Sequence, residues 1–144
     1  MKKVEIFEKK NKIPYSKTSI KEVIKTILEK EGVNNYNISI AYLTKDDLRE
    51  INKKYRKIDR TTNVLSFLYE KNSTFSGEVI VSDYHVIKKN EDFLKLLIHG
   101  ILHLLGYDHT KEEEKEEMLK KEKFYYNLIK NEKSKFSSKS QVRL

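Results

Sequence analysis

The segment from Phe93 to Leu105 constrains the fold of this chain more than any other part of the sequence. Nine of its thirteen residues are apolar. On a helix they fall on nearly every side, which is typical of a helix buried at the centre of a domain. Lys95, His99 and His103 interrupt the segment, and it is too short to cross a bilayer. The sequence therefore predicts a buried central helix.

Three histidines cluster in and just after this segment. His99 and His103 are four residues apart, which places both rings on one helix face, about 6 Å apart along the axis. Gly106 can adopt the left-handed conformation that ends a helix, and His109 can then approach the same point from a loop. Three neutral imidazoles with an open position are the composition of a catalytic zinc site. We predict that His99, His103 and His109 bind one zinc ion per chain.

Other interpretations of this cluster exist. Buried imidazoles need partners, and hydrogen bonds to carbonyl or carboxylate groups also supply them. Three imidazoles also accept nickel or copper. The spacing equals that of the metzincin proteases, but the glutamate that acts there as general base is here Gly100. A divalent ion can still lower the pKa of water by itself, so hydrolysis would draw its remaining groups from elsewhere. We expect Asp108 to orient a ligand imidazole or to form the turn, rather than to act as a base.

The rest of the chain has the periodicity of an α+β protein. Alternating apolar residues predict strands over 4–7, 37–43, 64–68 and 78–82, the last two as a hairpin. Helical spacing predicts helices from about 20 to Gly32, over 44–55, over 83–89, over 91–105 and from 110 to about 129. We expect a single domain with a mixed four-stranded sheet packed against about five helices, the central one carrying the metal motif.

Helix starts are predicted from capping signals. The capping-box spacing occurs twice, a further Thr–Asp pair opens a helix, and an asparagine precedes the central helix. The residues are Ser19 with Glu22, Thr44 with Asp47, Thr110 with Glu113, and Asn90.

Charge and cysteine content narrow the class of protein. The chain has 30 Lys and Arg against 22 Asp and Glu, for a net charge of +8. This charge favours a polyanion, RNA or DNA, over a membrane as partner. The chain has no cysteine, which excludes disulfides and thiolate metal sites. The first residues contain no apolar signal core, so we expect a cytoplasmic protein with no membrane partner.

A basic irregular stretch follows the helix that Thr44 opens. It contains Arg56, Lys57 and Arg60, and a guanidinium can bind two phosphate oxygens at once. The stretch is therefore a candidate phosphate-binding track. Basic residues at a helix end also stabilise the helix dipole, and charge alone does not separate these two interpretations.

Three sequence blocks resemble one known family. The histidine segment HGILHLLGYDH is similar to the H-G-x-L-H-L-x-G-Y-D-H signature of the YbeY family, bacterial rRNA maturation factors and single-strand-specific endoribonucleases. Tyr55-Arg56 and TNVLSF at 62–67 resemble the family's Y-R and T-[DN]-V-L-S-F, and GEVIVS at 77–82 resembles G-D-I-x-I-S. Thr61 and Leu68 replace usual prolines, Glu78 replaces a usual aspartate, and the segment between 82 and 93 is shorter than is common. These departures affect loops and leave the histidines and the arginine in place.

The resemblance implies a zinc-dependent endoribonuclease in 16S rRNA 3′-end maturation and ribosome quality control. His99, His103 and His109 would bind the zinc, Arg56 and His99 would be catalytic, and Arg56, Lys57 and Arg60 would contact RNA. Single-stranded RNA, especially rRNA, and the ribosome or ribosomal proteins are the implied partners. We expect residues 1–130 to form a single metal-dependent RNase domain and residues 131–144, which are rich in Ser and Lys, to form a mobile basic tail.

Two alternative functions stay open at this point. One is a ribosome-associated assembly factor whose metal is structural, and the other is a metzincin-like zinc peptidase. Gly100, the basic composition and the absence of a signal core count against the peptidase. A fourth protein ligand would favour a structural metal, and an open coordination position would favour catalysis.

Overall fold

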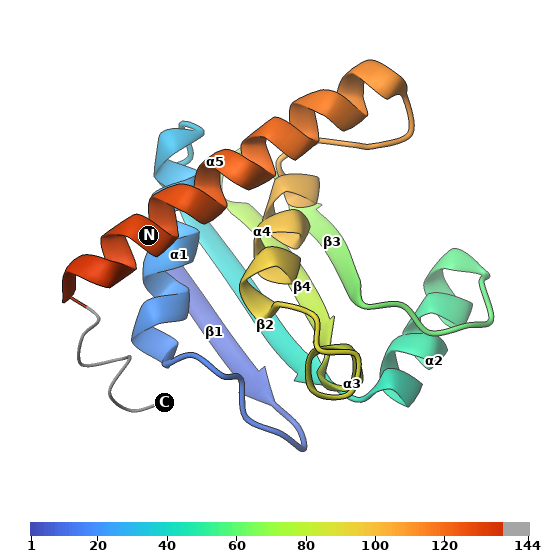
Figure 1. Cartoon of the computed structure of the whole chain (residues 1–144). Helices are drawn as coiled ribbons and strands as arrows, with labels where there is room; N and C mark the ends of the chain where they lie inside the picture. The colour runs from blue at the N-terminus through green and yellow to red at the C-terminus, as the bar shows by residue number, and fades with distance from the viewer. Residues whose placement is uncertain (137–144) are drawn as a thin grey trace.

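A four-stranded mixed sheet forms the centre of the structure (Figure 1). The computed structural model describes residues 1–136, and the side chains of residues 1–131. The strand order is β1 (Lys2–Glu8), β2 (Tyr36–Leu43), β4 (Phe75–Ser82), β3 (Val64–Glu70). The first three strands of this order are parallel, and β3 pairs antiparallel with β4. The predicted mixed sheet and its hairpin are confirmed.

Alternation along the strands sends apolar side chains to both faces of the sheet. On one face, Ile38, Ile40 and Tyr42 join a core with residues of α1 (Lys17–Lys30), α4 (Phe93–Leu104) and α5 (Glu112–Phe136). On the other face, Ala41 and Ile80 pack in a smaller core beneath α2 (Lys45–Arg56). The short α3 (Asp83–Ile87) follows β4. The structure therefore has three layers, with α2 on one face of the sheet and α1, α4 and α5 on the other. Helix α4 lies between the sheet and α5 (Figure 1).

The predicted central helix is α4, in which nine of twelve residues are buried. Its start differs from the prediction by two residues. Asp92 is the N-cap and accepts the backbone N–H of Leu94 at 2.9 Å. Asn90 takes a left-handed φ of 57° instead of capping the helix, because a further turn of chain separates β4 and α3 from α4.

Two other helix starts test the capping signals. Thr44 and Asp47 open α2 as predicted, and they form a capping box. The predicted box of Ser19 with Glu22 is wrong, because Ser16 caps α1 and accepts the backbone N–H of Ser19 at 3.1 Å. The stretch 16–19 therefore starts the helix one turn earlier than the spacing predicts.

The helix α5 is longer than predicted. It runs to Phe136, past the expected end near 129, and it begins at Glu112. The hydroxyl of Thr110 donates to Asp108 rather than capping this helix. Residues 137–144 of the expected tail lie outside the described residues. Among the helices described within 1–136, none is long and apolar enough to cross a membrane.

A carboxylate at the end of α1 connects three parts of the fold. Glu31 accepts hydrogen bonds from the hydroxyls of Tyr107, at 2.8 Å, and Tyr125, and an ion pair from Lys121 at 3.0 Å. Burial by itself raises the pKa of Glu31, but these three donors together outweigh burial and lower it. Glu31 thereby ties the end of α1 to α5 and to the loop that follows α4.

Gly100 lets α4 lie against the sheet. A Cβ at this position would meet Val79 Cγ1 at 2.5 Å and Ser66 Oγ at 3.2 Å. The hydroxyl of Ser66 also donates to the carbonyl oxygen of Gly100 at 2.9 Å. The absence of a side chain at 100 is therefore a packing requirement of this helix–sheet contact.

Gly100→Ala should lower the free energy of unfolding. Alanine gains about 1 kcal/mol of helix propensity over glycine, but overpacking beside a stiff valine costs about 1–3 kcal/mol. Chemical denaturation should show a net loss of up to about 2 kcal/mol, partly recovered by Val79→Ala in the same chain. The exposed control on the same helix, Lys95→Ala, should be nearly neutral. An alanine variant more stable than the parent would show that the sheet moves aside easily.

Glu31→Gln should remove part of the acid dependence of stability. Because the folded pKa of Glu31 lies below its ordinary 4.5, its carboxylate stabilises the fold above that pH and loses this effect as pH falls through the folded pKa. At pH 7 the variant should lose about 1–3 kcal/mol of unfolding free energy. The gap to the parent should shrink below about pH 4.5 in denaturation curves. A difference in unfolding free energy that does not change with pH would show that the ionised carboxylate of Glu31 does not stabilise the fold.

Candidate metal centre

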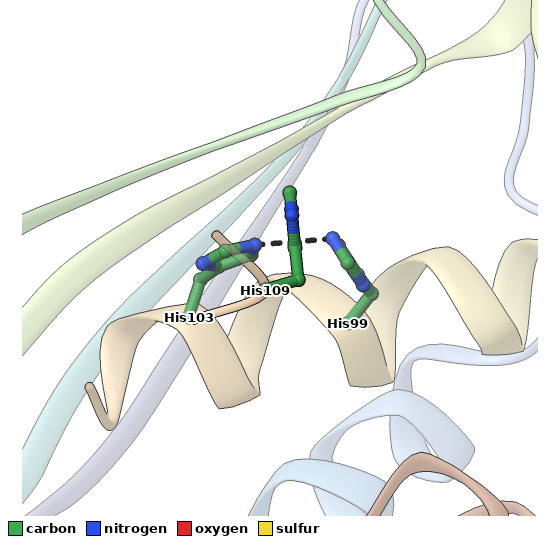
Figure 2. A group of neighbouring side chains, drawn as sticks. All are labelled: His99, His103 and His109. Carbon is green, nitrogen blue, oxygen red and sulfur yellow. Dashed lines mark hydrogen bonds between the residues drawn. The ribbon is translucent and has the colours of Figure 1, made fainter. Parts of the chain in front are cut away.

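Three imidazoles converge beside α4. His99 and His103 project from neighbouring turns of the helix, and His109 reaches them from the following loop (Figure 2). The ring centroids of His99 and His103 are 4.6 Å apart, and that of His109 lies 5.6 and 5.0 Å from them. One nitrogen of each ring lies within 4.8 Å of the others, so the group could hold a metal ion.

The spacing of the nitrogens suits a small divalent ion. Nε2 of His99 lies 3.1 Å from Nε2 of His103. Tetrahedral zinc with Zn–N bonds of about 2.0–2.1 Å requires ligand nitrogens about 3.3–3.4 Å apart. The two helix histidines therefore already have nearly the required separation. Nitrogen–nitrogen separations larger than this one, which stay within 4.8 Å, involve the ring of His109. His109 lies on an exposed loop.

The protonation of His103 favours metal binding. Burial lowers its pKa, and the neighbouring imidazoles of His99 and His109 lower it further, against the opposing effect of Asp108 and Glu122. Metals bind the neutral imidazole. Near neutral pH, His103 is therefore in the form that a metal requires.

The loop after α4 brings His109 back toward the helix. Gly106 has φ +100°, and the N–H of Tyr107 bonds to the carbonyl of Leu102 at 3.0 Å, which ends the helix as the sequence predicts. Asp108 forms the next turn, since its carboxylate accepts the backbone N–H of His109 at 2.7 Å and the hydroxyl of Thr110 at 3.1 Å. Of the two roles expected for Asp108, the structure supports the turn.

A cleft of about 590 Å³ adjoins the three histidines. Its lining comes from α4 with its following loop and from the chain between the end of α2 and β3. The guanidinium-bearing Arg56 and Arg60 line this cleft together with His99, His103 and His109. Among the described residues, none forms a hydrogen bond or ion pair with the side chain of Arg56, so its guanidinium is available to an anion.

The end of α2 decides which basic residues reach the cleft. Lys57 closes the helix with a left-handed φ of 60°, and its N–H bonds to the carbonyl of Asn52. The amide of Asn52, which is 2% exposed, donates to the carbonyl of Arg60 at 2.9 Å. These bonds hold Arg60 at the cleft, whereas Lys57 is not among the residues that line it. Tyr55, the residue before Arg56 on this helix, is 62% exposed.

Two carboxylates near the histidines were not found from the sequence. Glu122 of α5 lies 2.5 Å from Nδ1 of His99, and Glu31 holds Tyr107, two residues before His109. The sequence did contain a signal for Glu122. This charged residue shares the helical spacing of Met118, Tyr125 and Ile129, which are buried. Glu31 comes from a distant part of the sequence and carries no such signal.

Similar proteins were found in sequence and in structure. A sequence model of the family described as Endoribonuclease YbeY matches residues 3–130. Endoribonuclease YbeY of Sulfurihydrogenibium sp. is 40% identical, and the match covers 72% of this chain and 79% of that protein. Endoribonuclease YbeY of Clostridium botulinum strain 657 is 36% identical, and the match covers 81% of this chain and 92% of that protein.

A solved structure has a similar fold. The solution structure of a Thermotoga maritima protein superposes with a TM-score of 0.56 at 28% identity, covering 94% of this chain and 95% of that one. The family match spans both walls of the cleft and all three histidines. The chain therefore belongs to the Endoribonuclease YbeY family.

Proposed function

We propose that this chain is a metal-dependent endoribonuclease that hydrolyses phosphodiesters of single-stranded RNA. The observation that carries this proposal is the meeting of three imidazoles with Arg56 and Arg60 in one cleft. The relatives, which are named endoribonucleases, support the same activity. Following the family resemblance, the substrate we propose is rRNA, in 16S 3′-end maturation and ribosome quality control, with the ribosome or ribosomal proteins as partners.

Zinc is the ion we propose, one per chain, with His99, His103 and His109 as its ligands. The donor set of three neutral imidazoles fits zinc, and so does the separation of the first two nitrogens. Nickel and copper accept the same donors, so metal analysis of the purified protein identifies the ion. No other His, Asp or Glu of the described residues joins the group, and three protein ligands are typical of a catalytic zinc site.

The residues of the cleft have distinct roles in this proposal. When bound, the ion supplies Lewis-acid chemistry to the phosphodiester and to water. His99 is catalytic in the sense that it holds this ion. Arg56 binds the phosphate and stabilises the negative charge that develops on it, and Arg60 binds an adjacent phosphate. Lys57 would contact RNA only outside the cleft.

The structure supports this function over the alternatives. The position at which a metzincin peptidase carries its glutamate is Gly100, which packs against Val79 and has no room for a side chain. A purely structural metal is usually enclosed by four protein ligands, whereas this group has three and adjoins a cleft. We also propose residues 1–130 as the RNase domain, with the chain from 131 onward as an accessory basic segment.

His103→Ala should abolish metal binding and RNA cleavage together. Loss of a ligand removes more affinity than the about 10–100-fold lost with a residue that only supports a ligand. Metal content by mass spectrometry and cleavage of a single-stranded rRNA fragment, with and without chelator, measure both effects. The matched control is His85→Ala, because His85 lies on α3 and bonds to Ser82. Full cleavage by the His103 variant in the presence of chelator would remove the histidines from the site.

Arg56→Glu should keep the metal and lose activity. A charged hydrogen bond to phosphate contributes about 1.5–3 kcal/mol, which is about 10–100-fold in kcat/KM. The control is Arg49→Glu on the same helix, since Arg49 pairs with Asp59 and does not line the cleft. Steady-state cleavage rates at matched metal content test the difference. Equal rates for both variants would exclude Arg56 from the site.

A further inference from the structure

The two ring nitrogens of His99 have different partners. Nδ1 lies 2.5 Å from a carboxylate oxygen of Glu122, and Nε2 faces Nε2 of His103 at 3.1 Å. Both side chains are partly buried, with 29% of His99 and 26% of Glu122 exposed. The carboxylate therefore holds one edge of the ring while the other edge faces the point where the three histidines converge.

This arrangement matches one tautomer of His99. A histidine that binds a metal through Nε2 must carry its proton on Nδ1. A carboxylate oxygen facing Nδ1 suits the form of the ring that carries a proton on Nδ1. The contact with Glu122 therefore matches the tautomer and the ring orientation that a metal bound at Nε2 requires.

Within residues 1–131, no comparable carboxylate contacts the other two rings. Among the described residues, neither the ring of His103 nor that of His109 has a hydrogen bond to an Asp or Glu. Asp108, next to His109 in the sequence, uses its oxygens for the turn. His99 is therefore the ligand whose orientation the protein fixes most completely.

The packing of α5 fixes the place of Glu122. Met118 and Tyr125, one turn before and one turn after it, are buried in the core at 2% and 1% exposure. Tyr125 and Lys121 also bind Glu31 at the end of α1. A carboxylate held between two such anchors loses little further freedom when it binds the imidazole.

We propose that Glu122 is a positioning residue of the metal centre, which accepts the Nδ1–H of His99 and holds Nε2 toward the ion. This rests on the proposed function, in that the three histidines bind a divalent cation. Glu122 lies across the ring from Nε2, so it acts through His99 and is not itself a ligand. Residues that support a ligand in this way typically contribute about 10–100-fold in metal affinity.

The test compares Zn²⁺ affinity in three variants of the full chain. Competition with a chromophoric chelator should show about 10–100-fold weaker binding for Glu122→Ala. Glu122→Gln should fall between this variant and the parent, because its amide oxygen still accepts the Nδ1–H but carries no charge. The control Glu116→Ala, at an exposed position of the same helix, should match the parent.

A second measurement reports the ring itself. In the metal-free protein, ¹⁵N chemical shifts of the His99 imidazole should show the Nδ1–H tautomer in the parent and a mixture in Glu122→Ala. Thermal unfolding of the metal-free variants separates positioning from packing, since a packing role alone lowers the melting temperature without changing the tautomer. Should the alanine variant lose its fold, the glutamine variant carries both readouts.

The outcomes distinguish this inference from the function beneath it. Parent-like Zn²⁺ affinity and an unchanged His99 tautomer in the glutamine and alanine variants would overturn the role of Glu122 while leaving the metal site intact. A parent that binds no divalent ion would overturn the proposed function, and the tautomer measurement would still decide whether Glu122 orients His99.

Discussion

The placing of two partly buried imidazoles on an apolar helix is the constraint on which the rest of this structure depends. His99 and His103 are partly exposed at the cleft, on a helix in which nine of twelve residues are buried, and imidazoles partly removed from water need partners. The protein supplies them by facing the rings toward each other, by bringing His109 back through the Gly106 turn, and by placing Glu122 behind His99. The close approach of α4 to the sheet at Gly100 keeps this helix in place.

The chemistry of the site depends on a second element, the end of α2. The helix stops with Lys57 in a left-handed conformation, and Asn52 binds the chain that follows it. This local geometry turns Arg56 and Arg60 toward the cleft that the histidines line. Two segments about forty residues apart in the sequence thus meet in one cleft, one with neutral metal-binding donors and the other with fixed positive charge. That pairing suits a phosphodiester substrate.

Local patterns predicted the fold and the histidine group well, because alternation, helical spacing and the turn after His103 are encoded within a few residues. The cap of α2 was correct for the same reason, while Ser19, Asn90 and Thr110 failed as caps because alternative polar residues stand close by. The absence of Lys57 from the cleft lining was not predictable, since it follows a left-handed helix end that spacing along the chain does not report. Glu31 and Glu122 act through tertiary contacts, which spacing along the chain does not report.

X-ray absorption at the metal edge of the protein as purified tests the central claim most directly. About one zinc ion should be present per chain, bound by three imidazole nitrogens at about 2.0–2.1 Å and by one oxygen ligand that the protein does not supply. A protein that retains no ion when purified without chelator and exposed to zinc would contradict the account. So would an ion whose coordination shell is unchanged when His103 is replaced.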